Sequence, residues 1–175
     1  MATSEKRKAP VRLSTAYHEA GHAVTAWQDG FMLLGSTVES SEGTLGSVDY
    51  YVGRFGAIRP GPVVSSDAKA RRRRLIRFAL AGFRAESIFL SRVPNDHIDG
   101  ALEDMAKAVK LAQDLADTPE DVAAELDRQT LIVRKRLYRD RARVVALANA
   151  LREQRTLSGT ETERVIEAAV PQEER

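Results

Sequence analysis

Cysteine is absent from this 175-residue sequence, and its absence removes a whole class of chemistry. Without thiols the chain can form no disulfide bond, and any zinc ion must be held by imidazole and carboxylate groups. No apolar run approaches the roughly 18 residues that a membrane-spanning helix needs. The polar, basic stretch before Leu13 also lacks the apolar segment of a signal peptide. We therefore expect a cytoplasmic protein with no membrane span.

Charge of either sign is not in excess, because 27 basic side chains stand against 25 acidic ones. Two basic clusters, Arg71–Arg74 and Arg134–Arg143, nevertheless raise nucleic acid as a rival partner. On a helix, consecutive residues step round the axis by about 100°, so neither cluster forms the single stripe that a duplex requires. We interpret both clusters as mostly solvated helix surface, which disfavours a nucleic-acid partner.

The hydrophobic pattern predicts a mainly α domain of the α+β class over residues 13–170. It lies between a flexible basic tail at 1–12 and a disordered tail at 171–175. Thr118, followed by Pro119 and two acids, is a helix start signal, and Ser158 opens the last short helix. After the first helix, helices are expected at 67–91, at 101–117, from 119 to 153 with a break near 134–141, and from 159 to the residues before Pro171.

The first helix is expected to run from a cap at Ser14 or Thr15 to about Gln28, with Gly30 as its stop. Two short runs follow, 33–39 and 44–52. A turn at 40–43 would join them into a β-hairpin beside this helix, and residues 53–62 would form a loop. We interpret four aromatic residues as ordinary core candidates: Trp27, Phe31, Phe83 and Phe89.

The first helix carries the most informative motif, His18-Glu19-Ala20-Gly21-His22. Residues four apart lie on the same helix face, so His18 and His22 can direct two imidazole nitrogens at one metal ion. Glu19 lies about 100° round the helix, where its carboxylate can reach a metal-bound water without being a ligand. Because glycine inside a helix costs about 1 kcal/mol relative to alanine, Gly21 predicts a close helix neighbour.

A catalytic zinc site usually has three protein ligands and one open position. Composition leaves the third ligand open between His97 and any of the 25 acids. We interpret His97, in an expected loop, as a solvated side chain. Arg84 and Glu86 are interpreted as a structural helix pair or a surface feature.

The run Thr15-Ala16-Tyr17-His18-Glu19-Ala20-Gly21-His22-Ala23 resembles the opening of the peptidase domain of FtsH, the ATP-dependent zinc protease. The later segment Leu80-Ala81-Gly82-Phe83-Arg84-Ala85-Glu86 is similar to that family's Leu-Gly-Gly-Arg-Ala-Ala-Glu. The third ligand of the family is an aspartate in a Gly-Ala-x-Asn-Asp context. Gly100-Ala101-Leu102-Glu103-Asp104 is similar, and the resemblance therefore implies that Asp104 is the third ligand.

The resemblance implies a helical, zincin-like peptidase fold with a small β-hairpin or sheet beside the active-site helix. His18, His22 and Asp104 would hold Zn²⁺, and Glu19 would activate the zinc-bound water to cleave unfolded or flexible polypeptides. The strand at 44–52 could align an extended substrate. A catalytically inactive, peptidase-like interaction module, with or without zinc, is the alternative.

The sequence also departs from the family. It contains no phosphate-binding Gly-Lys-Ser/Thr loop, so we expect an isolated domain or a stand-alone peptidase-like protein without the ATPase module. The resemblance leaves open whether the chain forms a homo-oligomer and whether a separate ATPase delivers its substrate.

Overall fold

A computed structural model describes residues 10–39, 46–51, 66–90 and 98–169. This part of the chain is mainly helical with a small antiparallel sheet, which confirms the expected fold class. In chain order the elements are α1 (Leu13–Gln28), β1 (Met32–Thr37), β2 (Ser47–Tyr51), α2 (Ser66–Leu90), α3 (Ile98–Gln113), α4 (Pro119–Arg139), α5 (Arg141–Gln154), β3 (Thr156–Ser158) and α6 (Gly159–Ala168).

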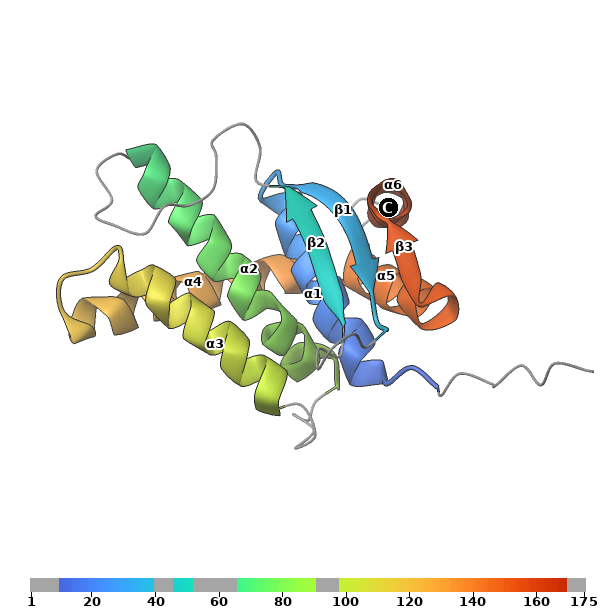
Figure 1. Cartoon of the computed structure of the whole chain (residues 1–175), viewed down its shortest axis with the longest axis horizontal. Coiled ribbons are helices and arrows are strands. Elements are labelled where there is room, and N and C mark those ends of the chain that lie inside the picture. The colour runs from blue at the N-terminus through green and yellow to red at the C-terminus, as the bar shows by residue number, and fades with distance from the viewer. Residues whose placement is uncertain (1–9, 40–45, 52–65, 91–97, 170–175) are drawn as a thin grey trace, which may run out of the picture.

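Helix α1 is the centre of the fold, with α2 on one side and α5 on the other (Figure 1). Alanine at positions such as Ala16, Ala20 and Ala23 is fully buried, so neighbouring helices can approach closely. The close helix neighbour predicted for Gly21 is found in α2, since a Cβ added to this glycine would lie 2.6 Å from the Cβ of Ala85. The prediction of close packing at Gly21 is confirmed.

The ends of α1 follow the sequence only in part. The prediction of a Ser14 or Thr15 cap was wrong, because the helix begins one residue before Ser14 and its N-cap, Arg12, makes no side-chain capping bond. The predicted stop at Gly30 is confirmed. Gly30 has a φ of 74°, and its N–H and that of Phe31 donate to the carbonyls of Trp27 and Ala26. This is a Schellman termination, which favours glycine.

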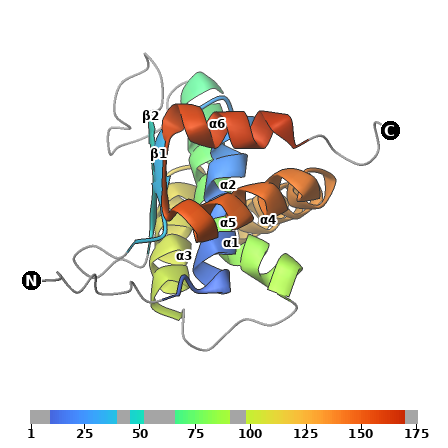
Figure 2. The ribbon, with the colours of Figure 1, turned by 90° about the vertical axis from the view of Figure 1, so that its right-hand side faces the viewer.

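The sheet covers one side of the helical layer and has three strands in the order β2-β1-β3 (Figure 2). The predicted hairpin is confirmed as the antiparallel β1–β2 pair, whose register shifts at Leu34. Strand β3, which pairs with the other edge of β1, had no counterpart among the predictions. The expected turn at 40–43 and the loop at 53–62 lie outside the described residues, as do both tails over most of their length.

The later helices begin largely where local signals place them. Thr118 accepts a hydrogen bond from the N–H of Asp121 and has Pro119 after it, and Ser158 forms a capping box with Glu161. The expected break in the long helical stretch falls at Asp140, between α4 and α5. Helix α3 starts at Ile98, three residues before the expected start at 101, because a glycine at 100 costs only about 1 kcal/mol in a helix.

The cluster Arg71–Arg74 is less solvated than predicted, whereas most basic residues of Arg134–Arg143 are exposed, as predicted. Arg72 is buried and donates to Asp114, while Arg73 donates to Glu125, because α2 packs against α3 and α4. Arg143 lies over the ring of Trp27 at 5.0 Å. Much of the positive charge is therefore used to hold helices together.

The aromatic core candidates divide by burial. Phe31 is buried, Trp27 and Phe89 pack against the core from partly buried positions, and Phe83 is half-buried. None of the described helices is both long and apolar enough to cross a bilayer.

Candidate metal centre

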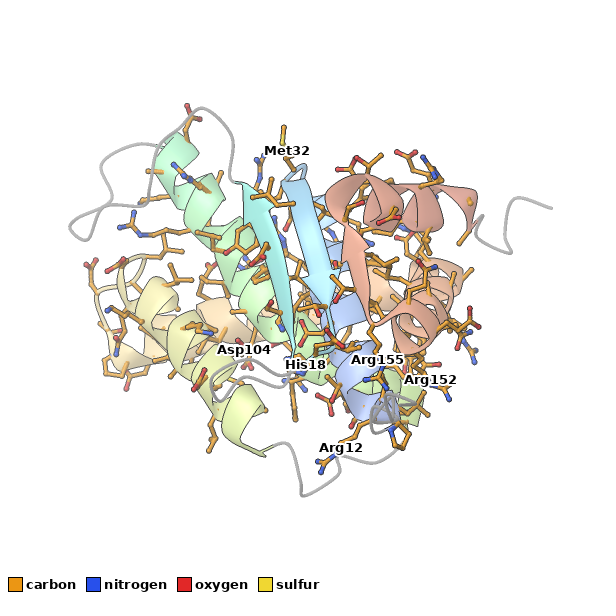
Figure 3. The ribbon with its side chains drawn as sticks, turned by 45° about the vertical axis from the view of Figure 1, so that its right-hand side comes forward. Arg12, His18, Met32, Asp104, Arg152 and Arg155 are labelled. Atoms are coloured by element: carbon orange, nitrogen blue, oxygen red, sulfur yellow. The ribbon has the colours of Figure 1, made fainter. Side chains whose placement is uncertain are left out.

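Three side chains from two helices that are far apart in sequence meet at one point. His18 and His22 project from neighbouring turns of α1, and Asp104 reaches them from α3 (Figure 3 labels His18 and Asp104). The two histidine Nε2 atoms are 3.0 Å apart, and Asp104 Oδ2 is 3.2 Å from the first and 3.0 Å from the second. Three potential ligand atoms thus form a nearly equilateral triangle that could hold a metal ion.

The outer nitrogens of both imidazoles are engaged elsewhere. His18 Nδ1 lies 2.6 Å from Glu86 Oε1, and His22 Nδ1 lies 2.7 Å from the backbone oxygen of Phe78. When Nδ1 donates to an oxygen, the lone pair is left on Nε2 and the ring orientation is fixed. Both histidines are therefore prepared to bind a metal through Nε2.

Helix α2 supplies this support from a single face. Phe78, Gly82 and Glu86 are four residues apart, so they stack along one side of the helix. A Cβ at Gly82 would collide with His22 Nε2 and would lie 2.6 Å from His18 Nε2. Glycine at this position therefore makes room for the imidazole tips and for whatever they bind.

The charges of the cluster are strongly coupled. Burial alone would lower the pKa of His18, but hydrogen bonds with Asp104 and Glu86 outweigh it and raise the pKa to about 10. Burial opposes ionisation of Asp104 as well, yet hydrogen bonds from the two histidines hold its pKa far below the usual range. A proton on His18 thus balances the carboxylates, and this is the charge that a bound cation would supply.

Glu19 lies beside the cluster and is buried. Burial raises the pKa of Glu19, and the nearby Asp104 and Glu86 charges add to this rise, while the two histidines oppose it. Gly46, the residue before β2, lies against this carboxylate, since a Cβ added to it would lie 2.6 Å from Glu19 Oε1. A raised pKa suits a group that must accept and return a proton near neutral pH.

Strand β2 contributes an aromatic wall. Tyr50 packs on Phe31 and Phe78, with ring centroids 5.3 and 4.4 Å apart, and Phe78 in turn contacts His22 at 4.7 Å. Burial and the charge of Asp104 raise the pKa of Tyr50, so the phenol stays neutral. This wall limits the access of water to one side of His22.

The structure brings together all four residues that the sequence singled out: Glu19, His18, His22 and Asp104. Glu86 was wrongly interpreted as a structural pair with Arg84 or a surface feature, because it is buried and bonded to His18. Its spacing of four residues from Gly82 puts both on one face of α2, but the sequence does not show that this face meets α1. His97 lies outside the described residues, so its interpretation as a solvated side chain stays a prediction.

Comparison of the sequence with protein-family models and with curated proteins found no match. The resemblance to the FtsH peptidase domain therefore stays a prediction, and the functional argument depends on the cluster itself.

Proposed function

We propose that this chain is a zinc-dependent metalloendopeptidase that hydrolyses peptide bonds of unfolded or flexible polypeptides. One observation carries the proposal. His18, His22 and Asp104 direct three ligand atoms at a common point, with the buried carboxylate of Glu19 beside them. This is the constellation of two imidazoles, one carboxylate and a separate base that metal-assisted hydrolysis uses.

The dimensions of the ligand triangle fit zinc. A tetrahedral zinc ion bound at about 2.0–2.1 Å keeps its ligand atoms about 3.3 Å apart. The separations of 3.0–3.2 Å in this cluster are close to that value. A set of two nitrogens and one oxygen, with no sulfur, also suits catalytic zinc and leaves one position for solvent. Lys107 contacts the other oxygen of Asp104, so it does not occupy the ligand position.

Bound zinc would polarise the scissile carbonyl and make the attacking water acidic. Glu19 would take the proton from this water and return it to the leaving amine, a role that its raised pKa favours. Glu86 and the carbonyl of Phe78 would keep both imidazole rings in the orientation that binds the metal, because they bind the two Nδ1 atoms. Tyr50 and Phe78 would keep one side of the site dry.

The choice of an unfolded substrate follows from the sheet. Within the described residues β2 pairs only with β1, which leaves its other edge available to an extended chain. An edge strand binds such a chain through backbone hydrogen bonds, and a folded protein seldom offers a free extended segment. The contact between Glu19 and Gly46, the residue before β2, supports a substrate position near the proposed base.

The test combines metal content with cleavage of casein. Wild-type protein should bind about one zinc ion per chain and cleave casein. Glu19→Gln should keep the zinc while its turnover falls by about 10²–10⁴-fold, because only the base is lost. Asp104→Ala should lose zinc and activity together. Undiminished turnover in Glu19→Gln would refute the assigned base.

The same assay distinguishes the alternative. Stoichiometric zinc in the wild type without cleavage of casein would support the inactive interaction module. No zinc in the wild type, even after zinc is supplied, would reject the metal centre itself.

A further inference from the structure

Among the described elements, none covers the outer face of helix α4. The fully or largely buried side chains of this helix recur every four residues along one side: Glu125, Gln129, Val133 and Leu137. The opposite side carries two large apolar residues, Leu131 and Tyr138, which are 51% and 55% exposed. They are seven residues apart, about two helical turns, so they share one face. Figure 2 shows α4 on the side of the helical layer away from the sheet.

The charges on this exposed face change sign at Leu131. Asp127 precedes it, Arg134 and Lys135 follow it, and all three are exposed. The ion pairs between described residues include none of the three. Burial and the neighbouring charge of Arg134 lower the pKa of Arg84 on α2, and Asp127 opposes this change. Positive charge is therefore in excess on the second half of the face.

We propose that a second copy of this chain binds the exposed face of α4, with the two helices antiparallel about a two-fold axis at Leu131. An interface of this symmetry must be self-complementary, because the same patch serves both copies. In an antiparallel pair, residues at equal distances before and after the centre lie opposite each other. Tyr138 follows the centre by seven residues and would cover Ala124, which precedes it by seven and is exposed. The small side chain of Ala124 leaves room for the ring of Tyr138.

The same arrangement joins opposite charges. Asp127 comes four residues before the centre, while Arg134 and Lys135 come three and four after it. Each Asp127 would therefore lie beside the two basic residues of the other copy, and symmetry makes this contact twice. Arg128 enters the same zone, but Glu125 of its own helix lies 4.0 Å away. A parallel, in-register pair would instead place like charges opposite each other, so the order of charges favours the antiparallel one.

The order of charges also favours a protein over a nucleic acid as the occupant. Acids at Glu120, Asp121 and Asp127 on the first half of α4 would repel phosphate groups. The expected dimer is weak, since each copy contributes two large apolar side chains and exposed ion pairs add little. The inference is independent of the proposed peptidase activity, because none of these residues belongs to the metal centre.

The experiment is sedimentation velocity of the full chain at low ionic strength, from about 10 μM to about 1 mM, the range of weak association. The wild type should shift from one chain to two as its concentration rises. Leu131→Asp should weaken this association by at least about tenfold, because it places two like charges at the two-fold axis. Leu102→Asp, which changes an exposed leucine of α3, is the matched control and should associate as the wild type does.

Charge reversal tests the antiparallel register. Asp127→Arg and Arg134→Glu each place like charges opposite each other twice, so each variant alone should associate at least about tenfold more weakly than the wild type. Mixed in equal amounts, the two variants should form a heterodimer. The introduced arginine of one chain then faces the introduced glutamate of the other, while the unchanged residues form the second pair.

A wild type that stays monomeric over the whole range overturns the proposal. A dimer that Leu131→Asp leaves unchanged does so too, because it places the interface elsewhere on the chain. Failure of the mixed charge variants to associate more strongly than either alone overturns the antiparallel pairing. A further arm adds a short DNA duplex. A monomeric wild type that binds this duplex, with binding lost in Arg134→Glu, would assign the face to nucleic acid instead.

Discussion

Each end of α1 takes part in a cluster of charged side chains, and the two clusters differ in the partners of their aspartate. Near its start, the Nε2 atoms of His18 and His22 lie 3.2 and 3.0 Å from Asp104 Oδ2, with no guanidinium among them. At its end, Asp29 is buried and bound by Arg77 through two donors at 2.7 and 2.9 Å, and by Arg136 at 2.7 Å.

Both clusters lie between α1 and α2, with α3 completing the first and α4 the second, but they differ in what they can still bind. Every oxygen of Asp29 accepts from a guanidinium, so this centre has no capacity for a ligand. Asp104 keeps Oδ2 for the histidines, while the exposed Lys107 contacts only Oδ1. The comparison teaches that a buried carboxylate belongs to a candidate site where it meets imidazoles that can exchange a proton for a metal ion, and is structural where arginine supplies a permanent positive charge.

Removing the carboxylate of Asp29 should have the largest effect on stability. Asp29→Ala leaves two guanidiniums largely buried and unpaired between α1, α2 and α4, which should lower the free energy of unfolding by about 3–5 kcal/mol. Urea unfolding followed by circular dichroism measures this loss. Asp117→Ala, an exposed aspartate, should change stability by no more than about 0.5 kcal/mol. Equal effects of the two variants on stability would refute the structural role of the Asp29 ion pairs.

Gly82→Ala should disrupt the metal centre without removing a charged group. The added methyl group would clash with the Nε2 atoms of both histidines and displace the rings, so we expect zinc binding to fall by at least about tenfold and casein cleavage with it. The helix itself should tolerate alanine, which is favoured by about 1 kcal/mol over glycine. Zinc titration beside thermal unfolding separates the two effects.

Gly21→Ala is the matched control on the facing helix. Its methyl group would meet Ala81 and Ala85 of α2 and not the imidazole tips, so it should destabilise the helix pair first. Unchanged zinc affinity in Gly82→Ala would show that the metal position is not the one inferred from the three ligand atoms.

Local signals explain how much of the fold the sequence could predict. The termination at Gly30, the cap at Thr118 and the capping box at Ser158 each depend on a few adjacent residues, and each is found where predicted. Strand β3 has three residues and pairs with β1 more than a hundred positions earlier, so no periodicity could reveal it. The burial of Arg72 likewise depends on α3 approaching α2.

The residues of the candidate site also differ in how far the sequence alone could identify them. The histidine pair follows from helix geometry, because a spacing of four residues fixes one face. Asp104 was selected by resemblance, since spacing in sequence cannot rank 25 acids. Glu86 required knowledge of which face of α2 meets α1, and that is set by Gly21 and Gly82 packing across the helix interface.

The smallest effect concerns Glu125, a carboxylate on α4 that extends the paired network away from Asp29. Burial would raise the pKa of Glu125, but hydrogen bonds from Arg73 and Gln129 outweigh it and hold the pKa below its usual value of 4.5. A group with a lowered pKa in the folded state stabilises the fold above its unfolded pKa, and this contribution is lost as the pH falls through the folded pKa. Melting temperature measured from pH 6 downward should therefore decline below about pH 4.5 in the wild type and decline less steeply in Glu125→Gln. Glu120→Gln, an exposed glutamate on the same helix, should keep the wild-type profile, and a flattened profile there instead would place the acid sensitivity outside the paired network.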